Sequence, residues 1–164
     1  EEMQSMCLKH NKELVVYLSM AFGNPYGELW SEEIVAKWGE KIAGLGVKTI
    51  ALADTIGVSN SDNITRLFST LIPAFPEVEW GAHLHTKPDI WREKVEAAYN
   101  SGCIRFDSAI KGLGGCPLAK DDLVGNLSTE KILSFAHEKK LKTGVKSLAF
   151  ESAYNKAMYT FFTT

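Results

Sequence analysis

The sequence lacks any long apolar run and any marked excess of charge of one sign. A membrane-spanning helix needs roughly 18 or more consecutive apolar residues, and no segment of these 164 residues approaches that length. The 18 Lys and Arg residues nearly balance the 20 Asp and Glu residues, for a formal net charge of -2. These two absences give no reason to expect a membrane or a nucleic acid as partner.

Cysteine is also scarce. The three thiols, Cys7, Cys103 and Cys116, are odd in number and irregularly spaced, which argues against a disulfide framework. A reducing compartment is the simpler expectation, so we expect a cytoplasmic protein. Residues 1–11 are polar and lack the charged-then-apolar pattern of a signal peptide. Because the chain does not start with Met, an upstream targeting segment, mitochondrial in a eukaryote, stays open.

The sequence does contain a repeated alternation of apolar runs and amphipathic segments. Runs typical of buried strands begin near residues 15, 48, 78 and 103. A segment with apolar residues at helical spacing follows each run, and a further helix is expected over residues 146–162. Strands that alternate with helices pair in parallel through right-handed crossovers. The pattern therefore predicts four parallel strand–helix units.

The length of these units predicts the fold class. A (β/α)8 barrel has about 250 residues, or about 31 for each of its eight units. We therefore expect an α/β fold of the (β/α)8 TIM-barrel type, with residues 1–164 forming a single domain that covers about half a barrel. The rival is an open doubly wound sheet, which is disfavoured because no Gly-rich phosphate loop follows the first strand. A half barrel exposes two sheet edges, so we also expect a homo-oligomer, most simply a dimer.

Polar side chains gather where the expected strands end. Asp54 follows the second strand, and His83 and His85 close the third. The active site of a (β/α)8 barrel forms at this end, and two histidines on one strand face can share a divalent cation. Taken alone, the histidines could simply be satisfied by hydrogen bonds, and Asp54 could cap a turn. Their common position at strand ends favours a functional site.

The most unusual segment is the glycine-rich loop after the fourth strand, which contains Gly112, Gly114, Gly115 and Cys116. Glycines next to a cysteine permit a tight or mobile loop whose backbone approaches a ligand closely. The thiol could act as an acid, a base or a nucleophile, or simply pack as an apolar side chain. A phosphate-binding loop is not supported, because no Gly-Lys-Ser/Thr follows.

Several segments together resemble the hydroxymethylglutaryl-CoA lyase family, within the wider group of metal-dependent lyase and Claisen-synthase barrels. They are ALADTIGV (51–58), GAHLH (81–85), FDSAIKGLGGCPLA (106–119) and GNLSTE (125–130). The resemblance implies that His83, His85 and Asn126 bind a divalent metal, Mg²⁺ or Mn²⁺. It implies a catalytic role for Cys116 on the loop, with Asp54, His83 and Glu130 also in the catalytic site. Thr55 and the loop glycines would lie near the substrate.

The implied reaction is cleavage of an acyl-CoA, 3-hydroxy-3-methylglutaryl-CoA, to acetyl-CoA and acetoacetate. The family's first strand supplies a further metal-binding Asp and an Arg, and neither can be assigned here. We therefore expect this chain alone to have little or no activity. A departure is Thr86, where the group often has Asp or Asn. A related aldolase or a 2-oxo acid Claisen synthase is one alternative, and a half barrel without catalytic activity is another.

Overall fold

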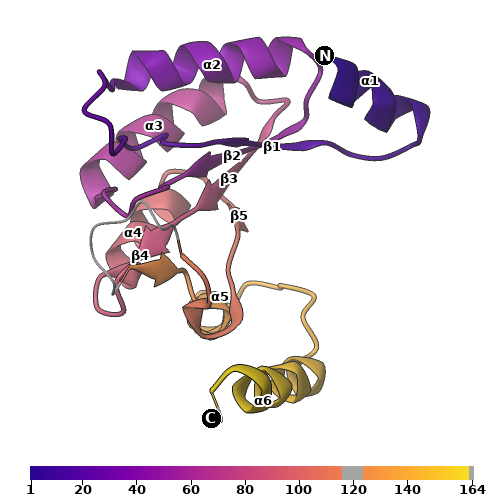
Figure 1. Cartoon of the computed structure of the whole chain (residues 1–164), viewed down its shortest axis with the longest axis vertical. Helices are drawn as coiled ribbons and strands as arrows, with labels where there is room; N and C mark the ends of the chain where they lie inside the picture. The colour runs from indigo at the N-terminus through magenta and orange to yellow at the C-terminus, as the bar shows by residue number, and fades with distance from the viewer. Residues whose placement is uncertain (116–123, 163–164) are drawn as a thin grey trace.

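The centre of the molecule is a parallel sheet of four strands in sequential order. The computed structural model describes residues 1–115 and 124–162. The sheet has the order β1-β2-β3-β5, formed by β1 (Val15–Leu18), β2 (Thr49–Ala53), β3 (Glu79–His83) and β5 (Arg105–Phe106). Each strand lies beside the strand of the next unit (Figure 1), as in a barrel and without the reversal of order found in a doubly wound sheet.

Helices connect these strands and cover the sheet. They are α2 (Glu32–Gly44), α3 (Ser61–Ala74), α4 (Trp91–Asn100) and α5 (Thr129–Glu138). Helix α3 packs against both α2 and α4. The Ser31 hydroxyl accepts a hydrogen bond from the backbone N–H of Ile34 and caps α2, and Asn60 and Asn63 form a capping box at α3. The strand–helix alternation predicted from the sequence is thus confirmed.

The main core lies between the sheet and these helices. Strand β2 is buried along its whole length, which explains its continuous apolar sequence. Ile50 and Leu52 pack in the same cluster as Leu67 and Phe68 of α3. A smaller cluster around Phe135 joins α4 to α5. The buried core therefore holds the carboxyl ends of β2 and β3 in fixed register.

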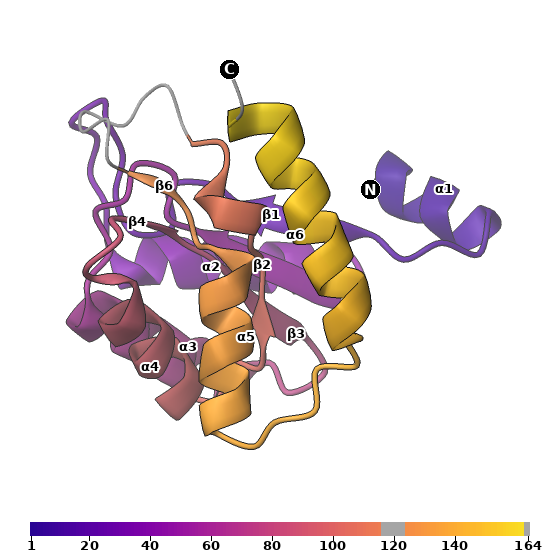
Figure 2. The ribbon, with the colours of Figure 1, turned by 90° about the horizontal axis from the view of Figure 1, so that it is seen from below.

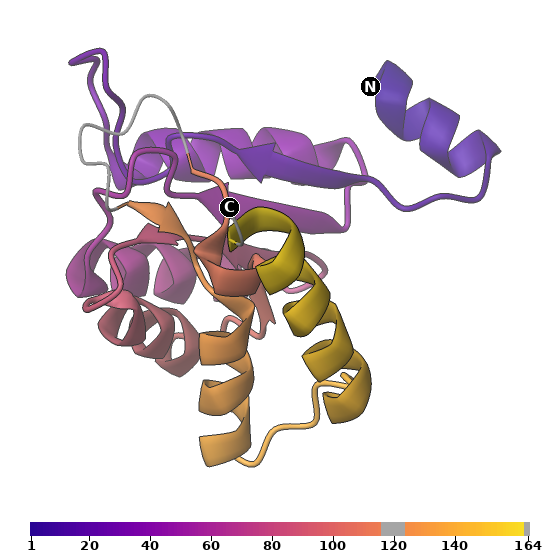
Figure 3. The same cartoon turned by 60° about the horizontal axis from the view of Figure 1, so that its bottom comes forward.

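The terminal helices are exposed by comparison. Neither α1 (Glu2–Lys9) nor α6 (Ser147–Phe162) contains a buried residue. Figure 2 and Figure 3 show α1 at the periphery of the fold, where the Gln4 side chain donates to the Gly46 carbonyl at 2.9 Å. Leu148 of α6 is 82% exposed although it is apolar. Within residues 1–115 and 124–162, no helix is both long enough and apolar enough to cross a membrane.

One small element was not predicted from the sequence. The third expected strand ends at His83, and the chain continues into a separate strand, β4 (His85–Thr86). This strand pairs antiparallel with β6 (Gly125–Asn126). A short 3-10 helix, η1 (Ile110–Gly112), precedes the glycine-rich segment. These elements bring the segment after β5 back to the end of β3.

Candidate active site at the carboxyl ends of the strands

Three of the predicted site residues come together at the carboxyl end of the sheet. His83 is the last residue of β3, and its ring centroid lies 5.4 Å from that of His85. His85 and Asn126 are directly paired across β4 and β6. Asp54 follows β2 and Glu130 lies in the first turn of α5, so neither is an immediate neighbour in this pairing. The two imidazoles and the amide form the centre of the candidate site.

His85 is held by a backbone carbonyl. Its Nδ1 lies 3.0 Å from the carbonyl oxygen of Thr55. A carbonyl can only accept, so Nδ1 donates, and the neutral ring carries its lone pair on Nε2. Burial lowers the pKa of His85, and the nearby His83 lowers it further, while the Thr55 carbonyl opposes the shift. His85 is therefore kept neutral, as a metal ligand must be.

His83 has a more polar and more open environment. Its Nδ1 lies 3.4 Å from Oδ2 of Asp107, a distance too long for a strong hydrogen bond, so the contact is mainly electrostatic. The Tyr17 hydroxyl donates to the same Oδ2 at 2.7 Å, and the Tyr17 ring stands edge-on to His83 at 5.3 Å. The contact with His83 and the Tyr17 hydrogen bond lower the pKa of Asp107, although burial opposes them.

Asp54 has a buried cationic partner that the sequence did not reveal. Lys94 Nζ lies 3.0 Å from Asp54 Oδ2, and both side chains are at most 1% exposed. The backbone N–H and the hydroxyl of Ser59 also donate to the Asp54 carboxylate. A signal was present in the helical pattern, because Lys94 lies one turn after Trp91 and one turn before Ala98, on the apolar face of α4.

The glycine-rich segment wraps around Asn126. The Asn126 side-chain amide donates to the Leu113 carbonyl at 2.8 Å, and its backbone N–H donates to Gly114 at 3.1 Å. Gly112 has a φ of +67°, and a Cβ there would stand 2.6 Å from the Asn126 carbonyl oxygen, so only glycine fits. Cys116, the predicted catalytic thiol, lies outside the residues that the structure describes.

A cavity of about 560 Å³ opens beside this loop. Its walls include Thr86, Gly112, Gly114, Gly115, Asn126 and Glu130. The Glu130 carboxylate accepts a hydrogen bond from the backbone N–H of Lys111 at 3.1 Å, which ties α5 to η1. The cavity thus adjoins the predicted ligand Asn126 and the predicted catalytic residue Glu130.

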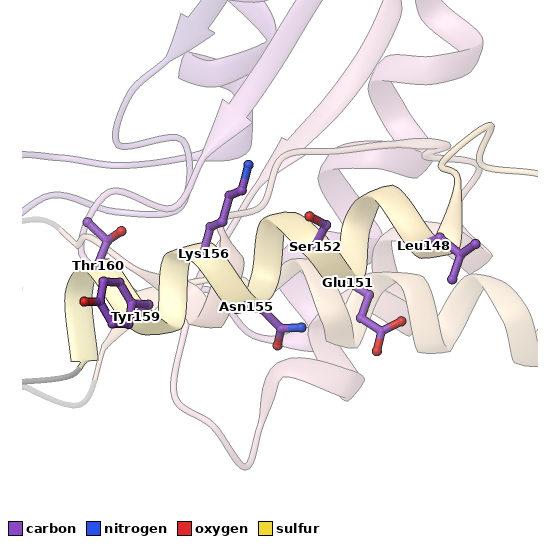
Figure 4. Close-up of a pocket in the computed structure, with 7 residues that line it drawn as sticks. All are labelled: Leu148, Glu151, Ser152, Asn155, Lys156, Tyr159 and Thr160. Carbon is purple, nitrogen blue, oxygen red and sulfur yellow. The ribbon is translucent and has the colours of Figure 1, made fainter.

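A second hollow, of about 650 Å³, runs along α6 (Figure 4). All the residues that form it belong to this one helix, and Lys156 and Glu151 extend from opposite sides of the helix. It contains no histidine or cysteine. We therefore place the candidate site at the strand ends and not on α6.

The donor set at the strand ends fits a divalent cation. His85 Nδ1 is hydrogen-bonded to the Thr55 carbonyl, which leaves its Nε2 available, as is usual for metal-binding histidines. His83 Nδ1 lies 3.4 Å from Asp107 Oδ2 and has no hydrogen-bond partner among the described residues. The Asn126 amide nitrogen donates to the Leu113 carbonyl, and the Asn126 side chain also contacts the His85 ring, so its oxygen is the atom that could bind a cation beside His85. In the part of the chain that the structure describes, no three His, Cys, Asp or Glu side chains cluster as a metal site. The candidate set is therefore two histidines and an amide oxygen.

A parallel sheet in sequential strand order, with histidines at the carboxyl ends, defines a partial (β/α)8 barrel. Comparison with known proteins identifies the family. The model of the HMGL-like family matches residues 4–156, so the chain belongs to that family. Hydroxymethylglutaryl-CoA lyase of Pseudomonas mevalonii is 34% identical over 79% of this chain. A protein of Chloroflexus aurantiacus named (R)-citramalyl-CoA lyase is 31% identical over 84% of it.

The fold comparison agrees. An HMG-CoA lyase structure from Acinetobacter baumannii, described as a complex with coenzyme A and 3-methylmalate, superposes with a TM-score of 0.82 at 29% identity. The match covers 96% of this chain and 51% of that one. This chain spans 42% and 43% of the lengths of the Pseudomonas and Chloroflexus relatives. The predicted fold class, a TIM-barrel fold covered in part by this chain, is confirmed.

Proposed function

We propose that this chain is the C-terminal half of a carbon–carbon lyase barrel that cleaves 3-hydroxy-3-methylglutaryl-CoA to acetyl-CoA and acetoacetate. The observation that carries the proposal is the pair of neighbouring histidines at the strand ends, with the His85 ring held by the Thr55 carbonyl, next to Asn126, which the glycine-rich segment contacts. Membership of the HMGL-like family and the lyase names of the relatives support it. The coenzyme A in the Acinetobacter complex supports an acyl-CoA substrate.

His83, His85 and Asn126 would hold a divalent cation, Mg²⁺ or Mn²⁺, in this proposal. When bound, such an ion supplies positive charge that stabilises negative charge on the oxygens of the substrate. His85 contributes a ring that is kept neutral and in one tautomer by the Thr55 carbonyl. Asp107 would act on His83 mainly through its charge, 3.4 Å from His83 Nδ1. Asp54 would stabilise the site through its buried ion pair with Lys94 and its hydrogen bond from the Ser59 backbone N–H.

The bonds that break and form in the proposed reaction give the glycine-rich loop with Cys116 a catalytic role. The substrate hydroxyl gives its proton to a base, the adjacent C–C bond breaks, and the electron pair remains on acetyl-CoA as an enolate. The Cys116 thiol would donate a proton to the enolate carbon as general acid. The cavity beside Gly112 and Asn126 would hold the substrate, and the glycine-rich segment would exclude water from the enolate. Glu130 would anchor this segment through Lys111.

Half a barrel has consequences for activity and assembly. The relatives are about twice as long as this chain, so we propose that the rest of the barrel completes the metal shell and that this chain alone turns over little substrate. Two sheet edges, β1 and β5, stay unpaired within the described residues, and association through them would give a dimer. Near-normal turnover by this chain would contradict the first proposal, and a monomer by light scattering would contradict the second.

The decisive assay is acetoacetate release from 3-hydroxy-3-methylglutaryl-CoA by the full gene product. We expect release with Mg²⁺ or Mn²⁺, none with EDTA, and a loss of about 100-fold or more in Cys116→Ala. Cys7→Ala is the matched control, because Cys7 lies in the exposed helix α1, and it should keep full activity. No release by a folded full-length protein would refute this function.

A second substrate class is favoured by one comparison, the Chloroflexus relative named (R)-citramalyl-CoA lyase. The same assay with citramalyl-CoA would follow acetyl-CoA and pyruvate as products. A higher kcat/KM with citramalyl-CoA would reassign the substrate and keep the lyase reaction. Condensation of acetyl-CoA with a 2-oxo acid would instead point to the Claisen synthases of the same group.

A further inference from the structure

Lys94 is a fully buried lysine to which the proposed reaction gives no role. Lysine is almost never fully buried unless it is paired. Its Nζ contacts three acceptors, Asp54 Oδ2 at 3.0 Å, the His85 carbonyl at 3.0 Å and the Gly57 carbonyl at 3.3 Å. An ammonium group has three N–H donors, so all of them are used. A pair of apolar side chains at positions 54 and 94 could fill this space without the cost of burying two charges, so the bonds that Lys94 forms need a reason of their own.

The three acceptors lie in the two segments that surround His85. The His85 carbonyl is bound directly. Asp54 and Gly57 belong to the turn after β2. This turn also contains Thr55, whose carbonyl accepts a hydrogen bond from His85 Nδ1–H. The Thr55 hydroxyl in turn accepts from the backbone N–H of Met20 at the end of β1. Lys94 therefore holds both the backbone of His85 and the turn that orients the His85 ring.

We propose that Lys94 is a positioning residue that fixes the orientation and the Nδ1–H tautomer of His85, leaving Nε2 directed at the site. It acts through the turn of residues 54–59 and does not contact the substrate. The importance of Nε2 for metal binding rests on the proposed function, whereas the tautomer is a property of the folded chain. The tautomer of His85 and its binding of a metal ion can therefore be tested separately.

The test compares Lys94→Met with Arg92→Met in chains labelled with ¹⁵N histidine. Arg92 is the matched control, because it lies on the same helix and forms an exposed ion pair with Glu138. Long-range ¹H–¹⁵N spectra report which imidazole nitrogen carries the proton. We expect a single Nδ1–H form for His85 in the unaltered chain and in Arg92→Met. We expect a mixture of tautomers in Lys94→Met, and Mn²⁺ affinity reduced about 10- to 100-fold.

Lys94→Met leaves the Asp54 carboxylate buried without its cation, which can prevent folding. Asp54→Asn/Lys94→Met removes both charges and provides the second variant. A folded variant of either kind that retains the single Nδ1–H tautomer of His85 would overturn the proposal. Failure of the full gene product to bind Mn²⁺ would count against the proposed function, and the tautomer spectra would still decide the role of Lys94.

Discussion

The two histidines of the candidate site are held in opposite ways. His85 is only 7% exposed, and its ring is fixed by a backbone carbonyl of a turn that a buried ion pair supports. The side chain of His83 is 31% exposed, and its neighbours are the side chains of Asp107 and Tyr17. The first environment depends on the core of the fold, and the second depends on polar side chains at the surface of the sheet.

The strands explain this difference. The turn around His85 follows β2, which is buried along its whole length between β1 and β3. Tyr17 and Asp107 come instead from β1 and from the segment after β5, the two outer strands of the sheet. Disruption around His85 should therefore destabilise the whole fold, whereas disruption around His83 should change the site with little effect on stability.

The largest effect should follow removal of the Asp54 carboxylate. Asp54→Ala leaves Lys94 buried without a counter-charge, which we expect to lower the free energy of unfolding by about 3–5 kcal/mol. Asp107→Ala removes a carboxylate that is partly exposed, at 22%, and should cost about 1 kcal/mol or less. Urea denaturation followed by circular dichroism measures both. Equal losses in the two variants would show that the two environments do not differ as described.

Substitution of Gly57 tests how tightly the turn after β2 is packed. Gly57 has a φ of +73°, and a Cβ there would lie 2.5 Å from Cγ1 of Val124. Gly57→Ala combines backbone strain with overpacking and should cost about 2–4 kcal/mol.

Gly27 provides the matched control for this substitution. Its φ is +72°, but a Cβ there would meet no atom within 4 Å. Gly27→Ala should therefore cost only the backbone strain, about 1 kcal/mol. If the two variants unfold at the same urea concentration, the contact between the turn and Val124 contributes nothing to stability.

Much of the fold could be predicted because it depends on local pattern. Apolar runs and helical periodicity indicated each parallel strand and each covering helix. The pairing of β4 with β6 was not predicted, since a ladder of two residues on each side produces no periodic signal. That pairing brings His85 and Asn126 together, so a central contact of the site depends on tertiary structure.

The candidate site was predicted in part for the same reason. Asp54, His83 and His85 could be found from their position at strand ends. Asp107 follows β5 in the same way, but it was not among the residues predicted for the site. Lys94 is forty positions from Asp54 along the chain, and no local rule pairs a helix lysine with a particular carboxylate. Only the packing of α4 against the turn after β2 brings them together.

The two histidine environments should also differ in pH dependence. The pKa of folded His85 is lowered from its ordinary value of 6.5, mainly by burial. As the pH falls, His85 therefore becomes protonated in the unfolded chain at a higher pH than in the folded chain. The free energy of unfolding should decrease as the pH drops through 6.5 towards the lower folded pKa. The pKa of folded Asp107 is also lowered, from 3.8. Its contribution is present above 3.8 and is lost only as the pH falls towards the folded pKa.

Urea denaturation at a series of pH values separates the two contributions. His85→Gln should flatten the decline just below pH 6.5, and Asp107→Asn should flatten only the decline in the more acidic range. His10→Gln serves as the control, because His10 is an exposed residue at the end of α1. A decline below pH 6.5 that persists unchanged in His85→Gln would remove the argument that burial keeps this ring neutral.

The smallest effect is expected from Tyr17→Phe. The substitution removes the 2.7 Å hydrogen bond to Asp107 but retains the ring that stands edge-on to His83. Because Tyr17 is 46% exposed, water can replace the lost donor, and the cost in stability should be about 0.5 kcal/mol. The pKa of Asp107 should rise, because the Tyr17 hydrogen bond helps to lower it, and NMR titration of the carboxyl carbon measures that change. Tyr26→Phe, at a 62% exposed position, should leave it unchanged. An Asp107 pKa that stays constant in Tyr17→Phe would mean that His83 and the charge of Arg105 stabilise this carboxylate without Tyr17, and the polar contacts around His83 would then be fewer than described.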